Sequence, residues 1–220
     1  MKVIKTKIDK KDIATMPVAA FKGKIVLIDT LAEAEKAVHF LMTLPLVGLD
    51  TETRPSFRKG ANHKVALMQV CAGEDICFLF RLNRLGMAEP LRRLMEAERP
   101  LKVGVSLKDD ILSLHRREEF LPQGIVELQS RVKEIGIQDM SLQKLFANFF
   151  HRKISKSQQL TNWEAPQLTP RQQLYAATDA WACIEIYHEL NRLEARKGSY
   201  RLETVPEAQP QREGQTALPA

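Results

Sequence analysis

The sequence predicts an α/β domain built on a mixed sheet of five or six strands flanked by helices. Short apolar runs of strand length alternate with longer segments of helical periodicity between residues 24 and 196. Two of these runs, 65–71 and 76–80, are separated by the short polar segment Ala-Gly-Glu-Asp, which is typical of a hairpin turn. The hairpin supplies antiparallel pairs and the alternating β and α segments favour parallel pairs, so we expect a mixed sheet.

The individual elements follow from the same periodicities. The expected strands cover 24–29, 46–52, 65–71, 76–80, 101–106 and 125–129. The expected helices cover 31–43, 88–97, 108–117, about 130–135, 141–149 and 170–196. Thr169 is a good N-cap and Pro170 suits a first helical turn, so the last helix has a clear start. Residues 151–169 are polar and irregular.

Composition excludes several classes of protein. The chain has 220 residues, of which 44% are apolar, and this is enough for one globular domain with a sizeable core. No stretch of eighteen apolar residues could span a membrane, and the N-terminus has no apolar segment typical of a secretory signal. Three irregularly spaced cysteines favour reduced thiols over disulfides or a zinc site. We therefore expect a cytoplasmic protein.

The positive charge lies mainly at the N-terminus. Residues 1–24 hold seven lysines and two aspartates, whereas 25–195 hold 22 basic and 22 acidic residues. A basic arm over 1–24 suits a polyanion such as nucleic acid, although it could also be a solubilising tail. We expect a catalytic domain over 25–196 and, from the polar, proline-containing C-terminal segment, a disordered tail over 197–220.

Two carboxylates share one side of an otherwise apolar strand. Asp50 and Glu52 project to the same face because side chains alternate along a strand, and Thr51 projects to the other. Two neighbouring carboxylates repel each other unless a cation lies between them. The alternative is a strand end exposed to solvent.

Two later segments contribute further acids. Asp109 and Asp110 follow the strand 101–106, where either could simply be a first-turn acid favoured by the helix dipole. Tyr175 and Asp179 lie one turn apart on an alanine-rich apolar helix, where Tyr175 could also be core filler and Asp179 a boundary residue. Together with Asp50 and Glu52, these acids could hold a pair of hard divalent cations such as Mg²⁺ or Mn²⁺.

The three acidic segments resemble, in order, the three motifs of the DEDDy 3′–5′ exonucleases. They are DTET at 50–53, VGVSLKDD at 103–110 and YAATDA at 175–180, and the segments RPSF at 54–57, VALMQVC at 65–71 and KSQQLTNW at 156–163 are also similar. This family includes ribonuclease D, the Werner exonuclease domain and the proofreading domain of DNA polymerase I. The resemblance covers residues 25–195 and implies a standalone domain of RNase H-like fold.

The resemblance also implies roles for individual residues. Asp50, Glu52, Asp110 and Asp179 would hold two divalent cations, Mg²⁺ or Mn²⁺, and Tyr175 would orient the attacking water. Asp110 is chosen over Asp109 because it lies six residues after Gly104, which matches the family's spacing. Tyrosine has an ordinary pKa near 10, so Tyr175 is expected to position water and not to act as a full base.

The partner implied is single-stranded or 3′-terminal nucleic acid. The implied contacts are Thr51, Thr53, Lys64, Gln69, Lys156 and Trp163, with Arg58 and Lys59 as further phosphate contacts. The basic residues could also be ordinary solvated surface, and Trp163 could either stack on a base or fill the core. The expected products are nucleoside 5′-monophosphates, with DNA favoured over RNA because residues 160–182 look closer to the Werner-type branch.

Two other functions remain open at this point. One is a catalytically inactive nucleic-acid-binding scaffold of the same fold, which the loss of one acid or of the tyrosine would favour; all five residues are present. The other is a phosphohydrolase acting on free nucleotides, which would need a closed pocket in place of an open groove.

Overall fold

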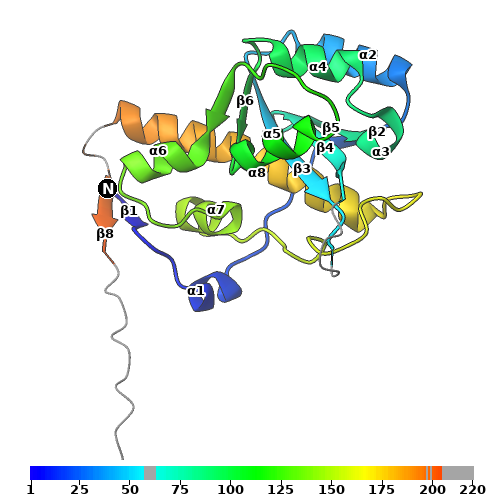
Figure 1. The fold of residues 1–220 in the computed structure, drawn as a ribbon. Coiled ribbons are helices and arrows are strands. Elements are labelled where there is room, and N and C mark those ends of the chain that lie inside the picture. Colours follow the sequence, from blue (N-terminus) through cyan, green and yellow to red (C-terminus); the bar gives the residue numbers. More distant parts are fainter. Residues whose placement is uncertain (57–62, 197, 199, 205–220) are drawn as a thin grey trace, which may run out of the picture.

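A six-stranded mixed sheet forms the centre of the protein (Figure 1). The computed structural model describes residues 1–56, 63–196, 198 and 200–204. The strands lie in the order β2-β5-β4-β3-β6-β7. Their bounds are β2 Lys24–Ile28, β3 Leu46–Thr53, β4 Val65–Ala72, β5 Ile76–Arg81, β6 Leu101–Gly104 and β7 Ile125–Glu127. Strand β4 pairs antiparallel with β3 and β5, and the other pairs are parallel, which confirms the predicted mixed sheet.

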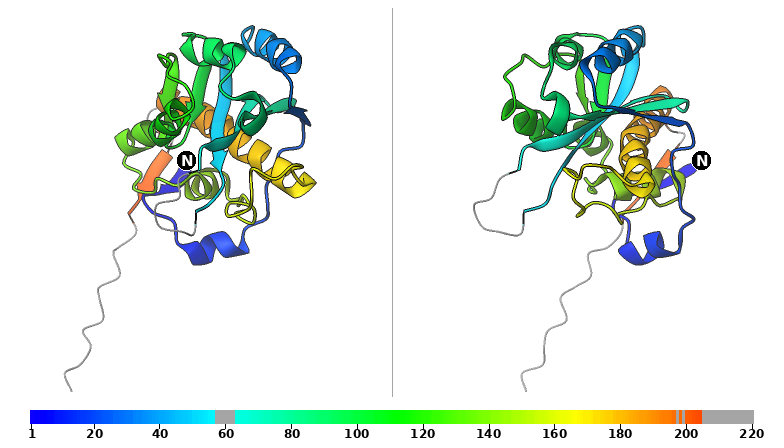
Figure 2. Two further views of the ribbon diagram at one scale, coloured as in Figure 1. Left: turned by 45° about the vertical axis from the view of Figure 1, so that its right-hand side comes forward. Right: turned by 90° about the vertical axis from the view of Figure 1, so that its right-hand side faces the viewer.

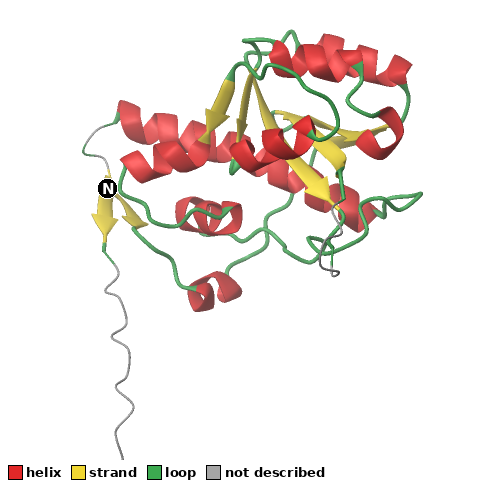
Figure 3. Ribbon diagram, in the orientation of Figure 1, coloured by secondary structure: helices red, strands yellow, loops and turns green. Residues whose placement is uncertain are grey.

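Helices cover both faces of this sheet (Figure 3). One face carries α2 Leu31–Leu41, α3 Leu82–Leu85, α4 Glu89–Glu96 and α5 Leu107–His115. The other face carries the long helix α8 Pro170–Ala195, against which α6 Leu128–Glu134 and α7 Leu142–Phe150 pack. In the right-hand view of Figure 2, α8 lies on the opposite side of the sheet from α2 and α4.

Alternation along the strands divides the core into two clusters. On β4, Leu67 and Cys71 belong to the cluster beneath α8, whereas Met68 and Val70 belong to the cluster on the opposite face. Both clusters are made of buried side chains, so the sheet is covered on both sides. Cys71, together with Cys77 and Cys183, is a buried free thiol, as predicted.

Helix α8 begins where the sequence predicts. Thr169 and Gln172 form a capping box, in which each side chain accepts a hydrogen bond from the other residue's backbone N–H group, and Pro170 occupies the first turn. The helix crosses β3, β4 and β5 and thereby brings its middle section over the acidic strand.

The two ends of the described chain form a small second sheet, which no local sequence pattern predicts. Strand β1 (Lys2–Lys5) pairs in parallel with β8 (Tyr200–Glu203), and helix α1 (Lys10–Thr15) follows β1. Ile4 and Ile8 are buried, and the Asn148 side chain bonds both backbone groups of Lys5. The N-terminal segment is therefore packed against α7. Its isoleucines add apolar contacts, which the net charge of the segment does not reveal. Residues 205–220 of the predicted tail lie outside the described residues.

Among the described helices, none is both long enough and apolar enough to cross a membrane.

Candidate catalytic site

Strand β3 places two carboxylates beneath α8. Asp50 and Glu52 project to the same side of the sheet, and Asp50 faces Gln69 across the antiparallel pair with β4. The Nε2 group of Gln69 donates a hydrogen bond of 2.8 Å to Asp50 Oδ2. This bond fixes the orientation of the Asp50 carboxylate from within the core.

Helix α8 adds the third carboxylate. Asp179 is 4% exposed and lies opposite β3, so that carboxylate oxygens of Asp50, Glu52 and Asp179 all lie within 4.8 Å of one another. The close approach depends on Gly48, because a Cβ atom there would lie 2.0 Å from the carbonyl oxygen of Ala180. A buried oxygen of Asp179, Oδ1, has no hydrogen-bond partner. The three-acid group therefore offers convergent oxygen ligands to a cation.

Asp110 lies at the edge of this group. It occupies the first turn of α5, is half-buried, and accepts a 2.6 Å hydrogen bond from the Thr51 hydroxyl. Its charge contributes to the raised pKa of Asp50, so the two carboxyls are close enough to interact. The neighbouring Asp109 is exposed. The choice of Asp110 over Asp109 thus agrees with the burial of the two side chains.

Burial and mutual repulsion favour the neutral form of these acids. Burial, with the nearby charges of Asp110 and Asp179, raises the pKa of Asp50 well above its ordinary value. Burial and the charge of Asp50 raise the pKa of Glu52 to about 10, and burial raises that of Asp110 to about 6. A cluster of this kind needs either protons or a multivalent cation to be stable at neutral pH.

Asp179 and Tyr175 influence each other across one helical turn. Burial raises the pKa of Asp179 to about 7, while the hydrogen bond from the Tyr175 hydroxyl and the positive charge of Lys156 oppose this rise. Burial, followed by the charge of Asp179, raises the pKa of Tyr175 far above its ordinary value. Tyr175 therefore stays neutral, which agrees with a role in positioning and not in proton abstraction.

Asp50, Glu52, Asp179 and Tyr175 line a hollow of about 260 Å³. Its other wall is formed by residues 105–106, 140–143 and 159, which lie outside β3 and α8. Ser106, one of the residues in this wall, adopts a left-handed conformation with φ of 65°. Glu127 Oε1 accepts a hydrogen bond from the Ser106 N–H group at 3.1 Å, and Gln129 donates one to its hydroxyl at 2.7 Å. Strained non-glycine residues of this kind cluster at functional sites. In the sequence, Ser106 lies two residues after strand β6, within the motif VGVSLKDD and before the acids of α5.

The predicted nucleic-acid contacts separate into two groups. Lys64 and Lys156 are exposed, and Thr53 is half-buried at the end of β3. Gln69 and Trp163 are 0% exposed, so a strand cannot reach them in this structure. The contacts predicted for these two residues are thus corrected to supporting roles, because both side chains are completely buried. Arg58 and Lys59 lie outside the described residues.

Trp163 instead supports Tyr175 from behind. The two rings pack with centroids 6.0 Å apart, and Trp163 lies in the loop before α8. Arg81, also 0% exposed, holds this loop by donating to the carbonyl oxygen of Ala165 at 2.5 Å. At the other end of the loop, Gln172 donates to the Thr161 hydroxyl at 3.0 Å. Sequence reasoning did not find Arg81, because an arginine at the end of an apolar strand usually points to solvent.

A family profile and curated relatives match most of this chain. The profile of a family described as 3′–5′ exonuclease matches residues 25–193. A 3′–5′ exonuclease of Arabidopsis thaliana is 30% identical over 199 residues, which cover 83% of this chain and 69% of the plant protein. The bifunctional 3′–5′ exonuclease/ATP-dependent helicase WRN of Mus musculus is 31% identical over 153 residues, which cover 67% of this chain and 11% of the mouse protein.

Solved structures show the same fold. The exonuclease domain of Aedes aegypti Nibbler has a TM-score of 0.72 at 19% identity, covering 81% of this chain and 94% of the mosquito chain. Escherichia coli RNase D, an exoribonuclease involved in structured RNA processing, has a TM-score of 0.69 at 22% identity, covering 79% of this chain and 46% of the bacterial one. These neighbours confirm the predicted RNase H-like fold.

Proposed function

This chain belongs to the 3′–5′ exonuclease family, and we propose that it shortens a nucleic-acid strand from its 3′ end, releasing nucleoside 5′-monophosphates one at a time. The observation that carries this proposal is the convergence of Asp50, Glu52 and Asp179 with Tyr175 around one open hollow. The family match over 25–193 supports residues 25–196 as the catalytic domain.

The donor set fits divalent cations. All the convergent ligands are carboxylate oxygens, the type that Mg²⁺ and Mn²⁺ prefer, and the unpartnered Oδ1 atom of Asp179 is a buried oxygen that a cation would satisfy. Asp50, Glu52 and Asp179 would hold two such ions, with Asp110 as the fourth ligand. Bound divalent cations would make the attacking water more acidic and stabilise charge on the leaving oxygen.

The chain's own groups would hold the reactants in place. Water adds to the terminal phosphorus, the bond from that phosphorus to the 3′ oxygen of the preceding nucleotide breaks, and that 3′ oxygen gains a proton in place of the one the water loses. Tyr175 remains protonated, so its hydroxyl can orient the water without taking its proton. The exposed ammonium group of Lys156, whose charge acts on Asp179, would attract the phosphate.

We propose DNA as the favoured strand, with RNA as the competing one. The similarity to the mouse WRN protein, at 31% identity, supports DNA through the Werner-type branch. The similarity in fold to E. coli RNase D, whose known role is in RNA processing, keeps RNA as the alternative. The hydroxyl of Thr51 is bonded to Asp110 and therefore offers no free donor to a ribose 2′-hydroxyl.

One assay tests the reaction and the substrate together. Labelled single-stranded DNA, recessed duplex DNA and RNA of equal sequence are incubated with Mg²⁺ or Mn²⁺, and the products are followed with time. We expect ladders that shorten by one nucleotide from the 3′ end, no product in EDTA, and faster loss of DNA. Cleavage of a closed circular strand, or activity that EDTA leaves unchanged, would contradict the proposal.

A further inference from the structure

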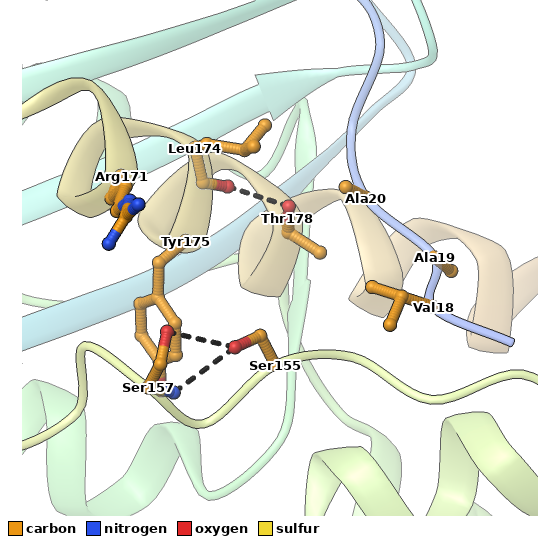
Figure 4. Close-up of a pocket in the computed structure, with 9 residues that line it drawn as sticks. All are labelled: Val18, Ala19, Ala20, Ser155, Ser157, Arg171, Leu174, Tyr175 and Thr178. Carbon is orange, nitrogen blue, oxygen red and sulfur yellow. Dashed lines mark hydrogen bonds between the residues drawn. The ribbon is translucent and has the colours of Figure 1, made fainter. Parts of the chain in front are cut away.

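A second hollow lies on the other side of Tyr175 (Figure 4). It measures about 150 Å³ and is formed by the segment 18–20, by Ser155 and Ser157, and by the first three turns of α8. Figure 4 shows the Tyr175 ring pointing from α8 toward the two serines. Tyr175 also lines the catalytic hollow, so its side chain forms a shared wall between the two spaces.

The walls of this second hollow suit a flat aromatic group with a polar edge. Leu174 and Val18, on opposite sides, are 39% and 58% exposed, although both are apolar. Ser155 Oγ and Ser157 Oγ lie 2.9 Å apart, and both residues are exposed. An apolar slot with a few hydroxyl groups resembles the general design of sites that accept a nucleobase, whose faces are apolar and whose edge forms hydrogen bonds.

The charge around the hollow favours a phosphate. Arg171 is exposed in the first turn of α8, and its guanidinium forms no hydrogen bond or ion pair with another described residue. None of the described residues that line the hollow is acidic. Lys156, between the two serines, is exposed as well. An unpaired arginine beside an apolar slot is complementary to a nucleotide, in which an anionic phosphate is attached to a flat base.

We propose that this hollow binds the base of the second nucleotide from the 3′ end, with Arg171 on an adjoining phosphate. This inference rests on the proposed function, which places the terminal nucleotide on the acid side of Tyr175. Because Tyr175 lines both hollows, they are neighbours, and successive nucleotides of one strand can occupy them. The site would make the enzyme bind strands of two or more nucleotides better than a single mononucleotide, which fits release of the product.

The test uses fluorescent strands and the full chain. Single-stranded DNA carries one 2-aminopurine at the first, second, third or fourth position from the 3′ end, and binds the Asp179→Asn variant in Mg²⁺. We expect the largest fluorescence change at the second position. Adding Leu174→Ala should weaken binding of an ordinary strand about tenfold, as for the loss of apolar contact with the base, and should not weaken binding of a strand that is abasic at the second position.

A matched control lies on the same helix. Arg171→Ala should weaken binding and flatten its dependence on salt, whereas Arg192→Ala, about 30 Å further along α8, should change neither. An equal fluorescence change at all positions, or a Leu174→Ala effect that persists on the abasic strand, would overturn the site.

Hydrolysis of unmodified DNA by the native chain separates the two ideas. If the strand is shortened in a metal-dependent way but the fluorescence change does not depend on position, only the proposed role of the second hollow is contradicted. A fluorescence change that is largest at the second position, without any shortening of the strand, would contradict the proposed function and support the binding site.

Discussion

Gly48 on β3 and Ala180 on α8 approach so closely that a side chain on the glycine would overlap the alanine's carbonyl oxygen. An added Cβ atom would lie 2.0 Å from that oxygen, and the obstacle is helix backbone, which cannot turn aside. Ala180 directly follows Asp179, and Gly48 lies two residues before Asp50. The contact therefore sets the separation between the helix and strand that supply the acids.

Replacement of Gly48 should disturb stability and activity together. Gly48→Ala has to push α8 away from β3, and we expect a loss of about 1–3 kcal/mol in the free energy of unfolding, as for other overpacked cores. Activity should fall further than stability, because Asp179 moves with the helix. Urea unfolding and the rate of nucleotide release measure the two effects. A variant with native stability and a native rate would show that the contact at Gly48 does not set the separation between α8 and β3.

The pH dependence of stability should reveal the acid cluster. Asp179 and Glu52 have folded-state pKa values of about 7 and about 10, above their ordinary 3.8 and 4.5. The folded state thus holds these protons more tightly, so their stabilising contribution is complete below the ordinary pKa values and is lost as pH rises through the folded-state values.

We therefore expect the Tm in EDTA to fall between about pH 5 and about pH 8, and Mg²⁺ to raise it more at the higher pH. Differential scanning calorimetry at both pH values, with and without Mg²⁺, makes this comparison. Asp109→Asn, which changes an exposed neighbouring acid, is the control and should leave the pH trend intact. A Tm in EDTA that rises over this range would contradict the cluster's electrostatics.

The Tyr175 hydroxyl should matter for turnover and little for binding. Tyr175→Phe keeps the ring that packs on Trp163 and removes only the hydroxyl. If that hydroxyl orients water, the single-turnover rate should fall by roughly 10²–10⁴, the range for a positioned acid–base group. Affinity for the strand, measured by anisotropy, should stay close to native. A native rate would reduce Tyr175 to a packing residue.

Arg81 should act on Tyr175 through the loop that carries Trp163. Arg81→Met removes the hydrogen bond to the Ala165 carbonyl and leaves that group without its buried donor. We expect a red-shifted Trp163 emission in a Trp181→Phe background and a lower turnover number, with KM changed less.

The control for this variant is Arg93→Met, a half-buried arginine on α4 whose ion pairs are with Glu35 and Glu89. It should leave emission and turnover unchanged. Native Trp163 emission in Arg81→Met would mean that the loop keeps its position without the arginine.

The sheet, α8 and the acid positions could be predicted because each depends on a local pattern. Period-two alternation places Asp50 and Glu52 on one face, and helical spacing brings Tyr175 and Asp179 together. The order of the three motifs along the sequence predicted that their acids belong to one site. What joins these segments in space, the close approach at Gly48, leaves no signal in the sequence beyond a glycine in a strand.

The supporting residues could not be assigned, because burial depends on which distant segment covers a side chain. Gln69 and Trp163 carry groups that could contact a strand, yet both are completely buried. Thr51 bonds Asp110 across 59 residues of sequence. The lysines of the N-terminal segment predict a basic arm, whereas the buried side chains of Ile4 and Ile8 determine where this segment lies.

The most direct test of the whole account is the single-turnover release of a labelled 3′-terminal nucleotide in Mg²⁺ by the native chain and by Asp179→Asn. The substitution keeps the shape of the side chain and removes the charge of a carboxylate whose oxygens lie close to those of Asp50 and Glu52. We predict that the native chain releases 5′-monophosphate and that the variant, still folded by circular dichroism, loses hydrolysis. Retention of more than about a tenth of the native rate, a change in barrier of only ~1.4 kcal/mol, would contradict the assignment of this acid group as the catalytic centre.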